Sequence, residues 1–395
     1  MKILISGAGI AGPTLAYWLL RYGHEPTLVE HASNLRTGGY VIDFWGAGYD
    51  IAGKMGLTPH LRDIGYFVEE VRFVDGEGRR SGGFSAEVFS EATRDRYVSL
   101  RRGDLASAIY GTIDGKVEAV FGDSIAAIEE TPEGVDVSFA RSAPRRFDLV
   151  IGADGLHSRV RELAFGPQDR FEDYLGYKVA AFEVPGYRPR DELVYVMYTE
   201  VGRQVARFAM RGDNTLILFV YIDEDRQMPA DVDDQKAAIA ARFADGAWEC
   251  GPILAALDAA DSLYFDRVSQ IRMDGWHSDR VALAGDAAFC ASLLAGEGSA
   301  LAMIAAYVLA GELHRADDDH VAAFSRYEAL MRPFILEKQK AARGFAGAFA
   351  PSSELGLFLR NQISKMLGIP FIAHLAIGRG LRDNIALPDY EADAA

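Results

Sequence analysis

Residues 2–12 read Lys-Ile-Leu-Ile-Ser-Gly-Ala-Gly-Ile-Ala-Gly, a short apolar run that enters a glycine-rich turn. Apolar residues with helical spacing follow over residues 10–22, and a second apolar run over residues 26–30 ends at Glu30. A strand, a turn, a helix and a second strand in this order predict a parallel, doubly wound sheet. The fold class expected from this opening is therefore α/β.

The glycines of this turn, Gly7, Gly9 and Gly12, have the G-x-G-x-x-G spacing of a dinucleotide-binding turn. The first allows a tight turn, the second lets backbone approach a pyrophosphate, and the third lets helix and strand pack closely. Glu30 follows at the end of the second strand, where a carboxylate can accept hydrogen bonds from ribose hydroxyls. We therefore expect a dinucleotide at this turn; the alternative is a glycine turn that only packs.

The chain has 395 residues, a formal net charge of −16 and 49% hydrophobic residues. That length allows two or three domains with a large core. The acidic balance argues against nucleic acid or an anionic membrane as the main partner, because both need basic surface. The two cysteines, Cys250 and Cys290, have no ligand-like spacing, which disfavours a disulfide framework or a cysteine zinc site.

The N-terminus does not read as a secretory signal. The longest clean apolar piece, residues 300–311, is shorter than the roughly 20 residues that span a bilayer. We expect a soluble, cytoplasmic protein without stable membrane insertion. The sequence has no histidine pairing or acidic triplet that indicates a metal, and no G-x-S-x-G motif that indicates a serine hydrolase.

The middle of the chain differs from its start. Several β-rich runs, separated by Gly, Pro and Asp turns, predict a mostly antiparallel sheet: residues 178–184, 193–198, 204–210 and 215–222. Four apolar side chains on these runs could line a substrate pocket, although half of any sheet faces a core: Phe208, Met210, Phe219 and Tyr221. We expect this sheet to be a second domain, inserted into the first.

The expected domains follow from these changes in pattern. A Rossmann-like nucleotide domain is built from separated segments at 1–73, 97–175 and 265–345, and the β-sheet substrate domain takes 74–96 and 176–264. A C-terminal helical segment with an acidic tail takes 346–395, with residues 386–395 expected to fray. Pro333, Pro351 and Pro370 are expected to break up the helical pattern of residues 321–377.

Two shorter expectations concern local structure. Residues 46–48, Gly-Ala-Gly, lack the third-glycine spacing and are expected to be a loop, so that the sequence contains one dinucleotide fold and not two. Residues 116–121 and 135–139 are expected to be strands on either side of the Pro132-Glu133-Gly134 turn.

Two later motifs place an aspartate after a buried strand. Residues 152–155 read Gly-Ala-Asp-Gly, with Arg159 and Arg161 following, and residues 285–286 read Gly-Asp. Gly296 and Gly298 then open a helix, whose N-terminus can stabilise negative charge. Taken singly, each motif could be an ordinary turn or glycine-rich connection.

The three motifs in this order resemble the class A FAD-dependent monooxygenases, the single-component hydroxylases of the para-hydroxybenzoate hydroxylase type. Further pieces carry the same resemblance: Gly-Gly-Tyr-Val-Ile-Asp at 38–43, Leu-Arg-Arg-Gly-Asp-Leu at 100–105, Tyr-Glu at 327–328 and Arg-Pro at 332–333. Within this family the sequence most resembles the tetracycline-inactivating monooxygenases, and the resemblance covers residues 1 to about 340.

The resemblance implies non-covalent FAD held between the two domains. It implies the following contacts: Gly7, Gly9, Ile10, Ala11 and Gly12 at the pyrophosphate turn, Glu30 at the adenosine ribose, His31 beside the adenine, Arg102 along the FAD, and Asp286 on the ribityl side. Backbone donors around Gly296, Gly298 and Ser299 would face the anionic reduced flavin. Arg36 and Asp43 are candidates near the flavin or the arriving nicotinamide, and Asp154 for FAD and NADPH.

The activity implied is insertion of one oxygen atom from O2 into a hydrophobic or aromatic small molecule, through a flavin C4a-hydroperoxide, with NADPH or NADH as reductant. No side chain need act as nucleophile, since the flavin carries the chemistry. NADPH would dock transiently, through Arg36 and the exposed members of the pair Arg159 and Arg161. Alternatives are another flavin oxidoreductase, such as a reductase or halogenase, and a non-catalytic flavin- or ligand-binding protein.

The sequence departs from the family pattern after Asp286. Phe289 stands where the family commonly has histidine, Ser292 and Leu293 stand at two prolines, and Ala300 stands at an asparagine. These changes concern the hydrogen bonds at the flavin edge and the substrates that fit beside the ring.

Overall fold

A five-stranded parallel sheet in the order β17-β11-β1-β2-β7 lies at the centre of the nucleotide-binding part. The structure is a computed structural model, and it describes residues 1–35, 38, 40–93, 95–317, 319–367, 383 and 385–390. Its strands are β1 (Lys2–Ser6), β2 (Glu25–Glu30), β7 (Glu118–Phe121), β11 (Leu149–Gly152) and β17 (Val281–Leu283). Ile3, Leu4 and Ile5 are fully buried, as expected for a strand covered on both faces. The predicted α/β class and the assembly from separated segments are confirmed.

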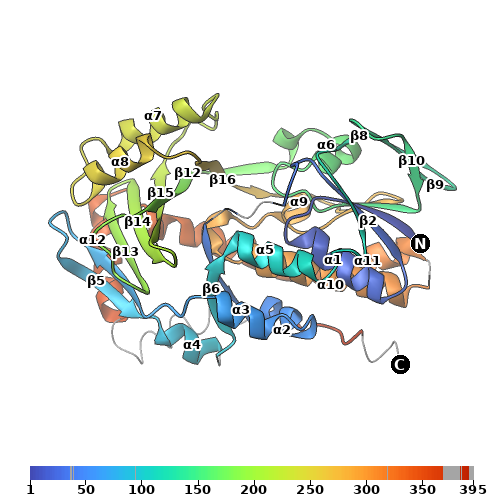
Figure 1. The fold of residues 1–395 in the computed structure, drawn as a ribbon, viewed down its shortest axis with the longest axis horizontal. Helices are drawn as coiled ribbons and strands as arrows, with labels where there is room; N and C mark the ends of the chain where they lie inside the picture. The colour runs from blue at the N-terminus through green and yellow to red at the C-terminus, as the bar shows by residue number, and fades with distance from the viewer. Residues whose placement is uncertain are drawn as a thin grey trace.

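Helices cover this sheet and connect it to a two-stranded antiparallel ribbon of β3 (Val41–Trp45) and β6 (Tyr97–Arg101). The helices are α1 (Ala11–Arg21), α2 (Gly46–Lys54), α3 (Thr58–Ile64), α5 (Arg102–Gly111), α6 (Arg159–Phe165), α9 (Asp286–Phe289), α10 (Gly298–Arg315) and α11 (His320–Phe349). Helix α10 is buried along nearly its whole length and lies among α1, α2 and α11 (Figure 1).

A seven-stranded sheet in the order β16-β12-β15-β14-β13-β4-β5 forms the other half of the molecule, and only its β13–β4 pair is parallel. Its strands are β4 (Glu70–Val74), β5 (Arg80–Ser85), β12 (Glu172–Pro185), β13 (Val194–Glu200), β14 (Arg203–Met210), β15 (Asn214–Ile222) and β16 (Tyr264–Ile271). The predicted, mostly antiparallel sheet is confirmed. The division of the chain into domains stays a prediction.

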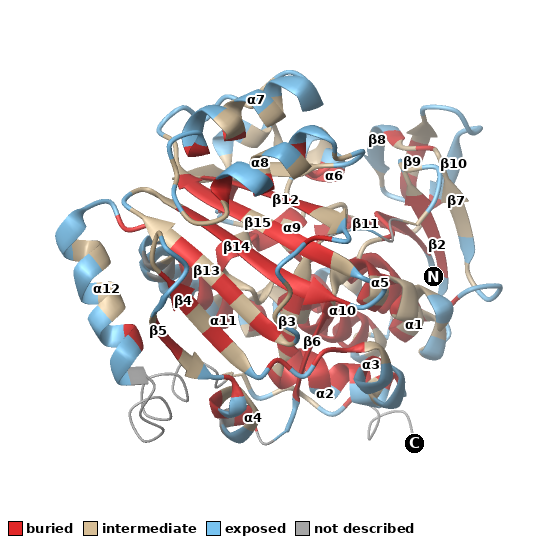
Figure 2. Cartoon of the chain, turned by 60° about the vertical axis from the view of Figure 1, so that its left-hand side comes forward, coloured by how far each residue is buried: buried red, intermediate tan, exposed pale blue. Residues whose placement is uncertain are grey.

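Four helices border this sheet: α4 (Glu87–Thr93), α7 (Val232–Phe243), α8 (Cys250–Asp258) and α12 (Glu354–Leu367). Helices α7 and α8 pack on one face through Ile239, Phe243 and Ile253, and α12 lies beside β5 (Figure 2). The opposite face of the sheet is turned toward the nucleotide-binding part. A site between the two halves is therefore bounded by this second face.

A small antiparallel sheet, β10-β9-β8, extends from the end of the parallel sheet: β8 (Ile125–Thr131), β9 (Gly134–Phe139) and β10 (Arg145–Phe147). The predicted pairing around the Pro132-Glu133-Gly134 turn was incomplete. The strand before this turn is β8, whereas β7 joins the parallel sheet beside β2. Residues 125–131 do not alternate between apolar and polar residues, and most of this strand is exposed, so its sequence pattern did not mark it as a strand.

The expected loop at residues 46–48 is wrong, since these residues begin α2. The Ala47 N–H donates to the Asp383 carboxylate at 2.7 Å, so the acceptor for the first turn comes from the far end of the sequence. Gly48 lies against Ala300 of α10, where a side chain would collide with backbone. A tertiary contact therefore makes a helix from a glycine-rich stretch.

Two expectations about the C-terminal part are also wrong. Pro333 lies inside the continuous helix α11 at an exposed position, where water can solvate the carbonyl that the proline leaves unpaired. Residues 386–390 do not fray: Tyr390 is fully buried against Gly311, and the Tyr307 hydroxyl donates to the Pro388 carbonyl at 3.0 Å. Pro351 does separate α11 from α12, whereas Pro370 and residues 391–395 lie outside the described residues.

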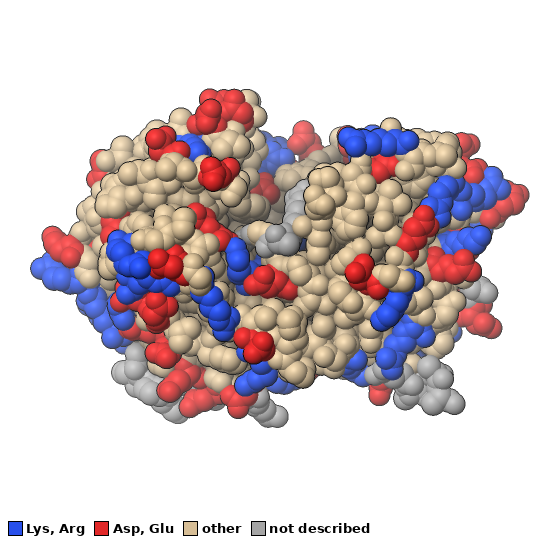
Figure 3. All heavy atoms as spheres, viewed as in Figure 1, with Lys and Arg blue, Asp and Glu red and all other residues tan. Residues whose placement is uncertain are grey.

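The face drawn in Figure 3 carries Lys and Arg side chains interspersed with Asp and Glu over both halves of the molecule. Within the described ranges, no helix is long and apolar enough to cross a bilayer.

Candidate functional site: a dinucleotide site at the carboxyl ends of the parallel strands

The first glycine turn has the geometry that its spacing predicts. Gly7 has φ +104°, and its N–H donates to the Val29 carbonyl at 2.7 Å. A Cβ on Gly12 would collide with the Gly7 carbonyl, so the third glycine is needed for the turn to close. A Cβ on Gly9 would meet only the Arg102 guanidinium, 3.7 Å away. The space beside the Cα of Gly9 is therefore open, and the Arg102 guanidinium, from another segment, borders it.

Glu30 is held beside this turn by backbone donors. Its carboxylate accepts the Ala8 N–H at 2.8 Å and the Ala32 N–H at 2.9 Å, and the His31 imidazole lies 2.9 Å from it. Oε1 is contacted by both Ala32 and His31, whereas Oε2 accepts only from Ala8 among these groups and retains a second lone pair for an outside donor. The side chain of His31 is mostly exposed, next to this carboxylate. The assigned ribose and adenine contacts of these two residues stay predictions.

Arg102 and Asp286 are near enough for the charge of one to act on the other, without forming an ion pair. Arg102 begins α5, and its N–H donates to the Tyr40 carbonyl at 3.0 Å. Asp286 begins α9 directly after β17; burial raises the pKa of its carboxyl, while the charge of Arg102 and the Cys290 thiol oppose that rise. Burial also raises the pKa of Tyr40 to about 12, against the charge of Arg102. Among the described residues, no carboxylate forms an ion pair with Arg102.

The start of α10 lies beside Asp286. A Cβ on Gly298 would be 3.8 Å from the Asp286 carboxylate, and Gly296 adopts φ +69° in the turn before it. Ser299 is buried in the first turn of the helix. The Leu301 N–H bonds to the Glu297 carbonyl, so the N–H groups of residues 298–300 precede the first intrahelical bond. These donors face the region that Asp286 also borders.

Ile10 and Ala11, at the start of α1, pack against the same group of helix starts. Both are buried at the start of α1, and Ala11 lies 3.3 Å from the Cβ position of Gly285. The starts of α1, α9 and α10 thus meet around Gly285, which has φ +63°. The structure therefore brings together the first glycine turn, Arg102, Asp286 and the glycines at 296 and 298.

Asp154 is near this site, but its carboxylate is used by its own segment. It accepts hydrogen bonds from the Ser158 and Ser6 hydroxyls and from the N–H groups of Arg159 (2.9 Å) and Val160 (3.1 Å). Burial raises its pKa, and the Ser158 bond opposes this. The backbone at Ala153 and Asp154 packs directly on Gly7. The aspartate anchors the start of α6, and its predicted contact with FAD or NADPH stays a prediction.

Asp43 lies inside a hydrogen-bonded cluster on the β3–β6 ribbon. One oxygen accepts the Tyr97 hydroxyl at 2.7 Å and the Ser99 hydroxyl at 2.5 Å. Burial raises the pKa of this carboxyl. The side chain also borders a cavity of about 10 Å³ that it shares with Glu297 and Ala300 at the start of α10. Asp43 is thus close to the start of α10.

The arginines predicted to contact the nicotinamide cofactor differ in burial and in pairing. Arg161 is fully buried and donates to the carbonyls of Ala287 and Leu156 at 2.9 and 2.7 Å, so it supports α9 and cannot meet an arriving phosphate. Arg159 is half-exposed and pairs with Glu162. Arg36 lies outside the described residues.

The substrate candidates divide between the two faces of the seven-stranded sheet. Phe219 and Tyr221 face α7 and contact Phe243, so their prediction as substrate contacts is wrong. Side chains alternate along a strand, and these two have the parity of the covered face. Phe208 and Met210 are on the face toward the nucleotide-binding part, but both are buried beneath neighbours such as Tyr66 and Tyr195.

Tyr40 and Tyr264 were not singled out from the sequence. Their rings lie 5.5 Å apart and join the nucleotide-binding part to β16, beside the partly exposed Leu218. No periodicity marks them, because the contact forms between segments more than 200 residues apart. They border the junction more directly than Phe208 does.

The departures from the family pattern are accommodated by packing. Phe289 is buried with its ring 4.6 Å from that of Trp276, in the core under α9. Ala300 faces Gly48 so closely that a larger side chain at residue 300 would displace α2. Phe289 and Ala300 are therefore both in apolar packing, and their effect on the flavin edge stays a prediction.

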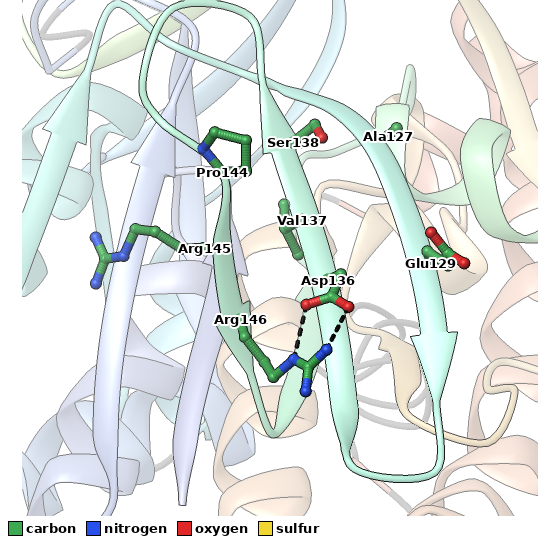
Figure 4. A pocket seen from close by; sticks show the side chains of 8 residues that line it. All are labelled: Ala127, Glu129, Asp136, Val137, Ser138, Pro144, Arg145 and Arg146. Carbon is green, nitrogen blue, oxygen red and sulfur yellow. Dashed lines mark hydrogen bonds and ion pairs between the residues drawn. The ribbon is translucent and has the colours of Figure 1, made fainter.

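A shallow recess of about 250 Å³ lies elsewhere, on the small sheet of β8, β9 and β10. Figure 4 shows that Arg146 on its floor is paired with Asp136, while Arg145 points away. Both of its arginines already have carboxylate partners, Asp136 for Arg146 and Glu118 for Arg145, so it lacks the open donors of the glycine-turn site. In the part of the chain that the structure describes, no cluster of His, Cys, Asp and Glu could hold a metal ion.

Comparison with known proteins agrees with this geometry. A family model described as an FAD binding domain matches residues 113–323. A flavin-dependent monooxygenase of Legionella longbeachae is 32% identical over 395 residues, which cover 99% of each chain. An uncharacterised protein of Mycobacterium tuberculosis is 36% identical over 346 residues, covering 85% of this chain and 91% of the other.

A solved structure gives the same result. The crystal structure of the tetracycline destructase Tet(55) superposes with a TM-score of 0.84 at 31% identity, covering 98% of both chains. The resemblance inferred from the motifs is confirmed. With FAD as its cofactor, the chain belongs to the class A flavin-dependent monooxygenases.

Proposed function

We propose that this chain uses NADPH or NADH and O2 to insert one oxygen atom into a hydrophobic or aromatic small molecule. One observation supports it above others: Gly9, Arg102 and the pair Asp286 and Gly298, from three distant parts of the sequence, converge where an extended FAD would lie. When bound, the flavin would accept hydride and activate O2.

The residues present fit such a group. Gly9 leaves room for a pyrophosphate, Arg102 offers a guanidinium, and the start of α10 offers N–H groups toward negative charge. Asp286 can accept from a ribityl hydroxyl. The protein's contribution is to orient the flavin, to exclude water and to stabilise negative charge at the start of α10.

The substrate would approach from the sheet side. Tyr40, Leu218 and Tyr264 are partly exposed at the junction and offer aromatic and aliphatic surface. Such surface favours an apolar or aromatic compound over a highly charged one.

The test uses the purified holoprotein. Acid precipitation is expected to release the flavin into the supernatant, and NADPH or NADH oxidation is expected to accelerate with a hydrophobic aromatic compound from a panel, with a product heavier by one oxygen atom. Flavin on the pellet would contradict non-covalent binding. Bound flavin without nicotinamide oxidation for any compound would favour the non-catalytic alternative.

The nicotinamide contact needs its own test. Arg36→Glu is expected to raise the apparent KM for NADPH and leave flavin content unchanged, because arginine matches phosphate geometry. Arg159→Glu is the matched charge reversal at the other candidate. Wild-type kinetics for Arg36→Glu would remove Arg36 from the proposal.

A further inference from the structure

Glu297 occupies the position before α10, at the end of the helix that faces the flavin site. Residues 298–300 there carry N–H groups that precede the first intrahelical bond. A helix N-terminus carries roughly half a positive charge, which favours an anion. A carboxylate on the residue directly before these donors is an acid that competes with any anionic ligand for them.

Lys338 of α11 controls where this carboxylate lies. Its ammonium is 2.8 Å from the Glu297 carboxylate and 3.0 Å from that of Asp383. The side chain is buried, with the ammonium 5.3 Å from the Phe334 ring centre. Burial alone would lower the pKa of Lys338, but the charges of Glu297 and Asp383 raise it. The lysine is therefore a buried cation shared by two acids.

The C-terminal segment, residue 383 with residues 385–390, fixes the second acid. Asp383 also accepts the Ala47 N–H at the start of α2 at 2.7 Å. Farther along, the Tyr390 hydroxyl donates to Glu312 near the end of α10 at 2.6 Å. The segment is thus bonded to α10 at Glu312 and is linked to Glu297, directly before α10, through Lys338.

The surroundings make the charge balance important. The cavity of about 10 Å³ between these groups has room for roughly one water and is bordered by Asp43, Glu297 and Asp383. Burial raises the pKa of Glu297, and Lys338 opposes that rise. The three carboxylates that border this cavity have one cation, Lys338, paired with two of them. Removing the cation would leave Glu297 uncompensated at low dielectric.

We propose that Lys338 is a positioning residue that draws the Glu297 carboxylate away from the start of α10 and neutralises it, so that the N–H groups there favour the anionic reduced flavin. This rests on the proposed function, since it requires the reduced flavin at that helix start. Charge near the flavin ring tunes its electronics.

The test is the midpoint potential of bound FAD in the holoenzyme, together with the affinity for oxidised FAD. Lys338→Met is expected to weaken the binding of reduced FAD relative to oxidised FAD by about tenfold. For a two-electron couple this lowers the midpoint potential by about 30 mV. Lys340→Met, at an exposed position of the same helix, removes the same charge and is expected to leave the potential unchanged.

Two further variants separate charge from packing. Glu297→Gln combined with Lys338→Met removes both charges. In this double variant the ratio of affinities for reduced and oxidised FAD is expected to return to within threefold of the wild-type ratio. Lys338→Arg keeps the charge and is expected to retain the wild-type potential. A merely structural role for Lys338 would lower FAD affinity in the double variant without restoring the potential.

The outcomes are distinct. A wild-type potential in Lys338→Met, or a double variant as low as the single one, would overturn the inference. If Lys338→Met does not fold, Glu297→Gln carries the test, since loss of the acid should favour reduced FAD by at least threefold and an unchanged potential would refute the role. Failure of the wild-type chain to bind FAD would instead refute the proposed function.

Discussion

Two neighbouring strands of the parallel sheet, β11 and β17, each end in a turn with glycine and aspartate, and the two turns serve different purposes. Asp154 after β11 accepts four hydrogen bonds from its own segment and from Ser6. Asp286 after β17 faces Arg102 and the start of α10. The difference shows that an aspartate at a strand end is available to a ligand only when its own helix does not use it.

The largest expected effect concerns Gly9, which defines the ligand side of this comparison. Gly9→Val places a branched side chain toward Arg102, where the pyrophosphate would lie. FAD affinity is expected to fall more than a hundredfold, with folded, colourless protein. Flavin content after gel filtration is the measurement, and Gly111→Val, at a position with open space, is the control. Unchanged flavin content in Gly9→Val would show that the pyrophosphate does not lie at Gly9.

Asp154→Ala tests the structural turn. The N–H groups of Arg159 and Val160 and the Ser158 hydroxyl would lose their acceptor, which costs about 2–3 kcal/mol of unfolding free energy. Urea unfolding of the apoprotein measures it, with the exposed Asp114→Ala as control. A stability equal to that of the control would show that the turn does not depend on this carboxylate.

Asp286→Asn tests the ligand-facing turn and should give the opposite pattern. Replacing the carboxylate that would accept from a ribityl hydroxyl with an amide is expected to weaken FAD binding about tenfold, a difference of about 1.4 kcal/mol. Stability of the apoprotein is expected to hold or rise at pH 7, because burial makes the charged carboxylate costly there. Isothermal titration and urea unfolding give the two numbers. A destabilised apoprotein with normal FAD affinity would reverse the comparison.

The smallest effect concerns His157, in the exposed part of the Asp154 turn. Its hydrogen bond with Asp266 of β16 raises the imidazole pKa, so protonation stabilises the fold. That contribution is complete below the unfolded pKa of about 6.5 and is lost as pH rises through the raised folded pKa.

His157→Gln is therefore expected to destabilise the protein at pH 6 by less than about 1 kcal/mol, since the imidazole is half-exposed, and by nothing measurable at pH 9. Thermal unfolding at both pH values measures it, with the exposed His60→Gln as control. Equal losses at both pH values would show that the contact does not depend on charge.

Sequence reasoning worked where spacing along the chain is enough. Gly7 and Gly12 close the turn as expected, because a turn between a strand and a helix is local, whereas the pyrophosphate contact of Gly9 stays a prediction. Asp286 and Gly298 are close in sequence, and the structure brings them together as expected. It did not work for Phe219 and Tyr221, because the parity of a strand tells which residues share a face but not which face is covered.

The amino-acid sequence by itself determined the parallel sheet, the antiparallel sheet and the glycine turn, because apolar periodicity and turn residues act over a few positions. Only the tertiary structure decided that residues 46–48 begin a helix, that Arg161 is buried, and that Lys338 lies between Glu297 and Asp383. Each of these depends on a partner far away in sequence. The spacing of residues along a chain contains no distance between such partners, so their hydrogen bonds and charges appear only when the chain has packed.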